Sequence, residues 1–98
     1  MTKDSVTTNV ADTLAERGKR YGSFAGHAEI TQKLKEAMMM HDNCIPWKTR
    51  LSRSQRESLD MIVHKIGRIL NGDPNYADSW HDIAGYAKLV EDEINAGQ

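Results

Sequence analysis

Two acidic side chains in the last third of the chain have the spacing of a metal-binding pair. Asp78 and Asp82 stand four positions apart, so they share one face if their segment is helical. Carboxylate oxygens are the ligands that Mg²⁺ prefers, and bound Mg²⁺ often shares its coordination shell with substrate phosphates. Lys65 and Arg68, in the segment before them, offer cations to those phosphates. The four residues therefore predict a site for Mg²⁺ and a phosphate-bearing ligand.

A second interpretation of the same four residues is structural. If the two segments form antiparallel helices, Lys65 comes level with Asp82, and Arg68 comes level with Asp78. Two cations would then face two carboxylates across one edge of a helical hairpin. Such an ion-pair cluster contributes little stability when exposed and mainly fixes the register of the helices. Both interpretations stay open.

Three other features fit the same phosphate-bearing ligand. Tyr86 and Trp80 lie near the acidic pair and offer rings that contact a nucleotide base. Lys19 and Arg20 lie in a basic turn, 18–22, that is bracketed by glycines. Glycine permits close backbone approach and cations attract phosphate. A solvated basic linker is the alternative for this turn, because neither the Walker nor the dinucleotide spacing is present.

Further metal-ligand residue types occur earlier in the chain. Glu57 and Asp60 are a second carboxylate pair at helical spacing, and His64 follows Asp60 at the next helical step. The histidines are scattered, so no Ser–His–Asp arrangement can be argued. The loop before this segment lacks a second Cys or His at structural-zinc spacing, although it contains three ligand types: His41, Asp42 and Cys44.

Residues 53–71 and 76–94 carry the pattern of two amphipathic helices. Ser52 stands three positions before Gln55, which is the spacing of a capping box. Apolar residues then recur at three- and four-residue steps in both segments. The sequence predicts an antiparallel helical hairpin whose two apolar stripes form the core: Leu59, Ile62, Val63, Ile66, Ile69 and Leu70 in the first, and Trp80, Ile83, Ala87, Val90 and Ile94 in the second.

Glycine, proline and asparagine mark the turn and the unusual positions of this hairpin. Gly72 suits a left-handed residue just past the first helix, Pro74 prevents continuation, and Asn75 suits the cap of the second helix. Gly67 and Gly85 lie inside the helices, where glycine costs about 1 kcal/mol relative to alanine. We therefore expect another helix, a second subunit or a ligand to pack closely against them.

The remaining chain completes a single all-α domain over residues 1–98. Residues 1–6 are expected to fray, a short helix is expected from Thr7 or Thr8 to near Gly18, and Ser23 is expected to cap the next helix. Phe24 is expected on the apolar side of that second short helix, with Ile30, Leu34, Ala37 and Met38. Residues 41–50 are irregular. Leu89 is apolar outside the stripes, which favours completion by a homodimer.

Composition limits the classes of function. The chain has 98 residues, with 13 Lys and Arg against 14 Asp and Glu, so no overall field favours nucleic acid. Residues 1–56 are net basic and residues 57–98 are net acidic. No apolar run approaches the roughly 20 residues of a membrane span. The single cysteine fits a cytoplasmic location.

Four stretches resemble a family of small phage and prophage proteins of unknown function. The stretches are 20–24, 55–62, 65–74 and 78–87, which contain the sequences RYGSF, QRESLDMI, KIGRILNGDP and DSWHDIAGYA. The resemblance implies a viral or prophage source, and hence a host cytoplasm as the location.

A further resemblance is to the MazG-like all-α nucleotide pyrophosphohydrolases. This resemblance implies a helical, oligomeric enzyme that uses Mg²⁺ to split a nucleoside triphosphate to the monophosphate. In that family E-x-x-E on one helix and E-x-x-D on a later helix hold the metal. Glu57-x-x-Asp60 resembles the first pair, whereas Asp78 and Asp82 are four positions apart instead of three.

Two functions follow as hypotheses. The first is a nucleotide-handling protein, of the magnesium-dependent pyrophosphohydrolase kind, with no organic cofactor. The second is a non-catalytic phage protein that binds a host protein through exposed apolar residues. Direct nucleic-acid binding ranks third, because no helix presents a dense basic face.

Overall fold

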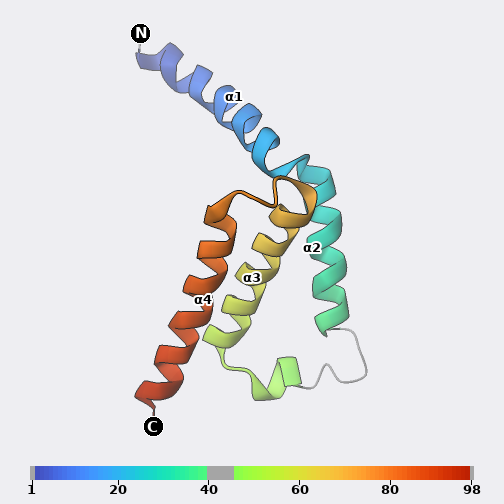
Figure 1. Cartoon of the computed structure of the whole chain (residues 1–98), viewed down its shortest axis with the longest axis vertical. Coiled ribbons are helices and arrows are strands. Elements are labelled where there is room, and N and C mark those ends of the chain that lie inside the picture. The colour runs from blue at the N-terminus through green and yellow to red at the C-terminus, as the bar shows by residue number, and fades with distance from the viewer. Residues whose placement is uncertain (1, 40–45, 98) are drawn as a thin grey trace.

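The computed structural model describes residues 2–39 and 46–97. The described residues form five helical elements joined by turns (Figure 1). These elements are α1 (Thr2–Tyr21), α2 (Phe24–Met39), the short π-helical turn η1 (Pro46–Arg50), α3 (Arg53–Asn71) and α4 (Ala77–Ala96). No described segment is a strand, so the predicted all-α class is confirmed. None of these helices has both the length and the hydropathy of a membrane span.

The predicted hairpin is present as α3 and α4. The first arm has the predicted bounds, and the second begins one residue later and ends two residues later than expected. The capping box is complete: the Gln55 N–H donates to Ser52 Oγ at 3.0 Å, and the Ser52 N–H donates to Gln55 Oε1 at 2.8 Å. This cap satisfies two backbone N–H groups that the first turn of a helix leaves without intrahelical partners. The sequence signal for the start of α3 is therefore confirmed.

The turn between α3 and α4 differs from the prediction in two respects. Gly72 has a φ of −133°, so it is not left-handed. Its role is close approach, because a Cβ there would clash with the Arg20 carbonyl. Asn75 is not the cap of α4, since Tyr76 holds that position without a side-chain hydrogen bond. Instead the Asn75 N–H donates to Asp73 Oδ1 at 2.9 Å, which forms an Asx turn of the kind Asp favours.

The helix α1 is longer than predicted. It begins at Thr2 and continues through Gly18 to Tyr21, because the Gly22 N–H still reaches the Gly18 carbonyl at 3.0 Å. Most of α1 projects away from the other helices (Figure 1). Fraying of residues 1–6 stays a prediction. The helix α2 begins as predicted, with Ser23 Oγ accepting from the Gly26 N–H at 3.1 Å.

The helices α2, α3 and α4 form a layer one helix thick, with α3 in the middle (Figure 1). Of the two predicted stripes, Val63 alone is buried, and it is the single large apolar side chain that is buried among the described residues. Leu70, Trp80 and Ile94 of these stripes are exposed. Phe24, expected on an apolar side, is exposed. The buried residues in the layer are mostly small or polar: His27, Thr31, Ser58, Lys65, Gly67 and Ser79.

The absence of an apolar core has a geometric reason. Small side chains allow neighbouring helices to approach closely, so the larger apolar side chains lie along the face of the layer instead of between its helices. Between α3 and α4, the buried Ser58 donates through Oγ to the Tyr86 carbonyl at 2.9 Å. The hairpin prediction is thus confirmed, whereas the assignment of the stripes to its core is confirmed for Val63 and wrong for the exposed Leu70, Trp80 and Ile94.

Gly67 explains how closely α2 and α3 pack. A Cβ at this position would lie 2.5 Å from Thr31 Cγ2 and 3.0 Å from the His27 ring. The predicted close contact at Gly67 is confirmed, and the neighbour is α2. Gly85 differs, because a Cβ there would have no heavy atom within 4 Å among the described residues.

The two glycines predict substitution effects of opposite sign. Gly67→Ala should lower the free energy of unfolding by about 1–3 kcal/mol through overpacking, because Thr31 Oγ1 is bonded to the His27 and Ala28 carbonyls and holds Cγ2 in place. Gly85→Ala should raise it by about 0.5–1 kcal/mol, because alanine is the better helix former. Urea denaturation at one fixed protein concentration measures both. Equal effects of the two substitutions would contradict the packing described for α2 and α3.

Candidate functional site

The structure keeps Lys65 and Asp82 of the predicted hairpin-edge cluster together and separates Arg68 from Asp78. Lys65 Nζ lies 3.1 Å from Asp82 Oδ2, and Lys65 is buried, so this pair follows the ion-pair interpretation. Arg68 does not pair with Asp78. Its guanidinium lies 4.1 Å from the centre of the Tyr21 ring. Asp78 instead accepts a hydrogen bond from the Tyr76 hydroxyl at 3.0 Å, which raises the pKa of Tyr76.

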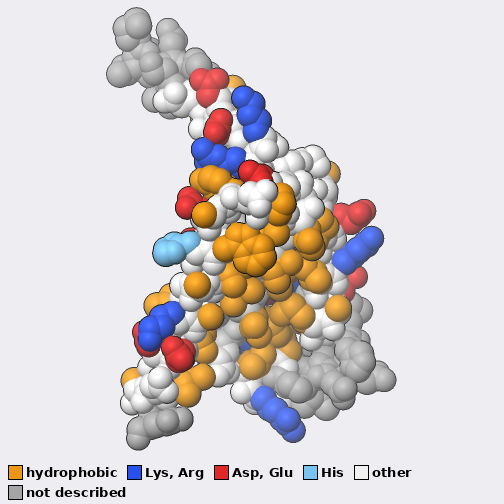
Figure 2. Space-filling view, in the orientation of Figure 1, with side chains coloured by type: hydrophobic (Ala, Val, Ile, Leu, Met, Phe, Trp, Pro, Cys, Tyr) orange, Lys and Arg blue, Asp and Glu red, His pale blue; other side chains and the backbone are white. Residues whose placement is uncertain are grey.

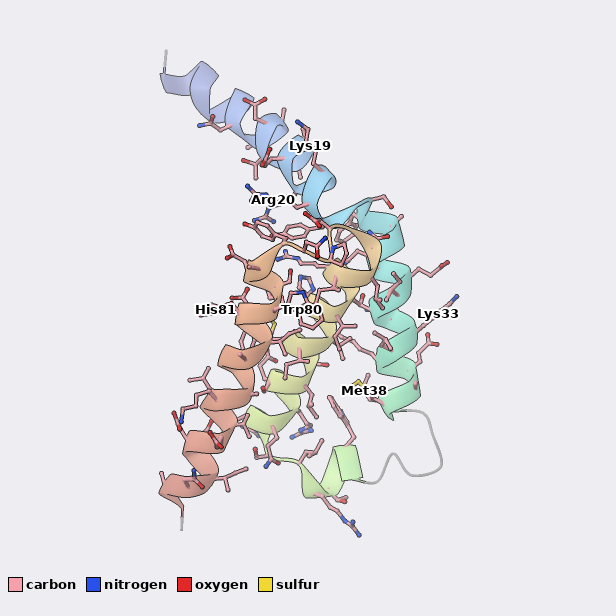
Figure 3. All side chains as sticks on the ribbon, in the orientation of Figure 1. Lys19, Arg20, Lys33, Met38, Trp80 and His81 are labelled. Atoms are coloured by element: carbon pink, nitrogen blue, oxygen red, sulfur yellow. The ribbon has the colours of Figure 1, made fainter. Side chains whose placement is uncertain are left out.

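Apart from Tyr86, the other predicted phosphate and base contacts do not converge on that edge. Trp80 Nε1 donates to the Pro74 carbonyl at 2.8 Å, and Tyr86 lines a shallow groove along α4 together with Asp82. Figure 3 shows Lys19 pointing away from the hairpin. Arg20 pairs with Glu16 at 2.9 Å and lies over the Tyr76 ring.

The two predicted carboxylate pairs lie beside different neighbours of α3. Glu57 and Asp60 line a groove of about 430 Å³ next to α2, where Asp60 Oδ1 is 4.0 Å from Lys35 Nζ. Asp78 and Asp82 belong to α4 on the other side of the layer. Within the described part of the chain, no three His, Cys, Asp or Glu side chains are grouped so that they could hold a metal ion. The predicted ligands His41, Asp42 and Cys44 lie outside the described residues.

Rings and cations instead gather where α1 meets the hairpin. Arg20 lies 4.8 Å from the centre of the Tyr76 ring, and Tyr76 contacts Tyr21 edge-on with 6.1 Å between ring centres. Arg68 covers the other ring, that of Tyr21. The order Arg20, Tyr76, Tyr21, Arg68 places two rings between two cations. Cation–π contacts of this kind are worth about 0.5–1 kcal/mol each at exposed positions, so the stack attaches the end of α1 to the hairpin.

Hydrogen bonds to backbone carbonyls hold the same junction. Asn71 Nδ2 donates to the Tyr21 carbonyl and to the Ser23 carbonyl, both at 2.7 Å, and the Asp73 N–H donates to the Arg20 carbonyl at 2.6 Å. Gly22 has a φ of +76°, and a Cβ there would clash with the Asn71 carbonyl. Glycine is therefore required both for the left-handed conformation and for the close approach. We call the turn 21–23 bound to Asn71 the Asn71 clasp.

Next to the Asn71 clasp, α1, α2 and α3 enclose a pocket of about 450 Å³. This volume is in the usual range for small-molecule sites. Two arginines and two histidines line the pocket, no Asp or Glu does, and the first turn of α2 adds the positive end of a helix dipole. We call it the arginine–histidine pocket, and its lining residues are Leu14, Arg17, Gly18, Tyr21, Gly22, Ser23, Phe24, His27, His64 and Arg68.

A histidine pair forms one wall of the pocket. His27 Nε2 lies 3.2 Å from His64 Nδ1, and the ring centres are 4.5 Å apart. Burial, followed by the charge of His27, lowers the pKa of His64 to about 4. Burial and then the charge of Arg68 lower the pKa of His27. His27 Nδ1 lies against Gly67 and makes no hydrogen bond of good geometry with any described residue.

The positive charges around this histidine pair determine which charge a ligand can carry. Arg68, Lys65 and Lys35 all act on the histidines, so a further cation would meet repulsion and an anion attraction. The pocket therefore suits a negatively charged group better than a metal ion.

Sequence reasoning missed Arg17, His27 and His64 as neighbours in one site. The two histidines are 37 positions apart, and no short motif connects them. One signal was present: His64 and Gly67 share a helix face, so the helix that packs at Gly67 must also approach His64. Of the four cations predicted to bind phosphate, Lys19, Arg20, Lys65 and Arg68, Arg68 alone lines the pocket.

Comparisons of this chain with protein-family models, with curated proteins and with solved structures found no match. The functional assignment therefore depends on the geometry of the site itself.

The histidine pair predicts a specific loss of stability in acid. His64 stays neutral in the folded protein down to about pH 4, whereas the unfolded chain binds a proton near the ordinary pKa of about 6.5. The unfolded state thus binds more protons between these values, so stability falls as the pH is lowered from about 6.5 to about 4. His64→Gln should flatten this slope, as measured by urea midpoints across that range. The exposed His81→Gln is the matched control and should keep the wild-type slope, and a wild-type slope in His64→Gln would contradict the assignment.

Proposed function

We propose that this protein binds a nucleotide, or a closely similar ligand with a phosphate and a ring, in the arginine–histidine pocket. The observation that carries the proposal is the combination of two arginines, the N-terminus of α2 and no carboxylate around a volume of about 450 Å³.

The phosphate end of the ligand fits the side of the pocket formed by Arg17 and Arg68. Arg17 is exposed and forms no ion pair within the described part of the chain, so its guanidinium is available to a ligand. Guanidinium groups bind phosphate oxygens through two parallel hydrogen bonds. The first turn of α2 begins at Phe24 beside them, and helix N-termini offer backbone N–H groups to anions.

The ring end fits the apolar side of the same pocket. Phe24 is 83% exposed and Leu14 is 66% exposed, although both border a pocket that also contains the Tyr21 ring. Nucleotide bases stack on such aromatic faces without needing a particular base edge. Exposure of the Phe24 ring to water costs free energy, and the proposed ligand would cover this ring.

Magnesium-dependent hydrolysis is a separate proposal that binding does not require. The carboxylates implied for it, Glu57, Asp60, Asp78 and Asp82, lie in two places on opposite sides of α3. The positive pocket neutralises phosphate with side chains, so the proposed binding persists in EDTA. Hydrolysis would instead require Mg²⁺ and would release pyrophosphate.

The binding proposal is tested with Arg17→Ala. Loss of one charge-assisted contact should raise the nucleotide Kd about tenfold to a hundredfold, as expected for about 1.5–3 kcal/mol. Lys19→Ala is the matched control, because Lys19 has the same charge on the same helix but does not line the pocket. Isothermal titration with a panel of mono-, di- and triphosphates, each with and without Mg²⁺, measures both variants. Absence of binding by the wild-type protein, or equal losses in the two variants, would contradict the proposal.

The alternative function, a non-catalytic phage protein that binds a host protein, is favoured by a different surface. Leu89 is exposed on α4 and borders the shallow groove that Gly85 and Tyr86 also line. A partner helix could approach closely at Gly85, where no described side chain intervenes. The nucleotide titration separates the two functions, because a protein-binding surface on α4 requires no ligand between α1, α2 and α3.

A further inference from the structure

One face of the helical layer is apolar and uncovered. Figure 2 shows hydrophobic side chains running almost without interruption across α3, α4 and the neighbouring part of α2. Trp80 lies within this face (Figure 3) and is 55% exposed, and Leu70 is 66% exposed. The face includes the two stripes that the sequence assigned to the hairpin core. A contiguous apolar surface of this kind marks an interaction site.

The accessible surface of the chain measures how much is left uncovered. It is 7308 Å² for a mass of 11.0 kDa, whereas a compact monomer of that mass exposes about 5,600 Å². The excess is about 1,700 Å² per chain. Permanent dimers bury roughly 2,000–5,000 Å² in total, about half from each copy. Part of this surplus belongs to α1, which projects from the other helices (Figure 1), and part to the uncovered apolar face. A permanent dimer interface removes about 1,000–2,500 Å² per copy from water, so an interface on that face fits within the surplus.

We propose that the occupant of this face is a second copy of the same chain, packed layer against layer about a twofold axis. With Val63 as the single buried large hydrophobe among the described residues, one copy lacks the apolar core that stabilises a domain. If a partner completes the core of this chain, that partner must be present whenever the chain folds. A second copy of the same chain meets this condition. A twofold axis brings the same face of each copy together. This inference is independent of the proposed nucleotide site, which lies where α1 joins α2 and α3.

A pair of matched substitutions tests which face is used. Leu70→Glu places a charge on the apolar face, and Leu89→Glu places the same charge at a residue of similar exposure, 60%. Leu89 is nine positions from Trp80, which places it about 180° away around α4. Sedimentation equilibrium should give wild-type protein and Leu89→Glu a mass of about twice 11.0 kDa. Leu70→Glu should weaken dimerisation at least about a hundredfold, because each copy would bury an unpaired charge.

Each result of this experiment decides the proposal. A wild-type chain that stays a folded 11.0 kDa monomer at all concentrations overturns it and points to a different protein as the occupant. Dissociation by Leu89→Glu with a dimeric Leu70→Glu also overturns it, because the other face of α4 would then form the interface. Equal dissociation by both variants overturns the choice of face as well.

Tryptophan emission gives a second readout, which does not require a variant with glutamate on the apolar face to fold. Trp47→Phe leaves Trp80 as the single tryptophan, since the chain has two. On dilution, the emission of Trp80 should shift to longer wavelength as the covered ring becomes exposed to water, and the midpoint should match the dimer dissociation constant. Emission that is independent of concentration across a measured dimer–monomer transition overturns the proposal.

Discussion

The side-chain amide of Asn71 is the contact on which the arrangement of this molecule depends. It donates one hydrogen bond to the carbonyl of Tyr21, the last residue of α1, and one to the carbonyl of Ser23, the cap of α2. One side chain at the end of α3 therefore fixes the direction in which α1 leaves and the position from which α2 begins. Partly buried backbone carbonyls need such partners. The Ser23 carbonyl also accepts the first bond of α2, from the His27 N–H at 3.1 Å, so the Asn71 amide adds a second donor there and joins it to the Tyr21 carbonyl.

The rest of the junction follows from the approach that this contact requires. Gly22 and Gly72 bring the two backbones together where any side chain would clash. The stack of Arg20, Tyr76, Tyr21 and Arg68 then closes around the crossing. Farther along the layer, Gly67 lets α2 lie against α3, which brings His27 to His64. The arginine–histidine pocket is the space that remains between these contacts.

The close packing also accounts for the uncovered apolar face. When helices approach through Ser58, Gly67, Thr31 and Ser79, their large apolar side chains cannot lie between them and instead turn to one side of the layer. A layer of three helices built in this way presents an apolar face, which is the face on which we propose that a second copy packs.

The sequence predicted the local features of the fold well. The capping box at Ser52 and the breaks around Pro74 depend on neighbouring residues, so they could be placed from sequence. Helical periodicity correctly grouped the apolar residues, but it states which side chains share a face and not what covers that face. For this reason Leu70 and Trp80 were assigned to the hairpin core together with Val63, although both are exposed.

The candidate site was harder to predict because its residues come from three helices. Lys65 and Asp82 were paired correctly, since the register of a hairpin follows from counting outward from its turn. His27, His64 and Arg17 come together only through the Asn71 clasp and the approach at Gly67, and neither contact has a short sequence signature. Arg68 was expected to bind phosphate from the hairpin edge, and its cation–π contact with Tyr21 turns it toward the pocket instead.

The most direct test of this account is hydrogen exchange at the Asn71 side chain, followed by NMR. Both Nδ2 protons donate to carbonyls, so both should exchange slowly, together with the Asp73 backbone N–H that donates to Arg20. The side-chain amide of the exposed Asn75 provides the comparison and should exchange at the rate of a free amide. If the Asn71 amide exchanges as fast as that of Asn75, the turn between α1 and α2 is not held in the way described, and the pocket built around it loses its basis.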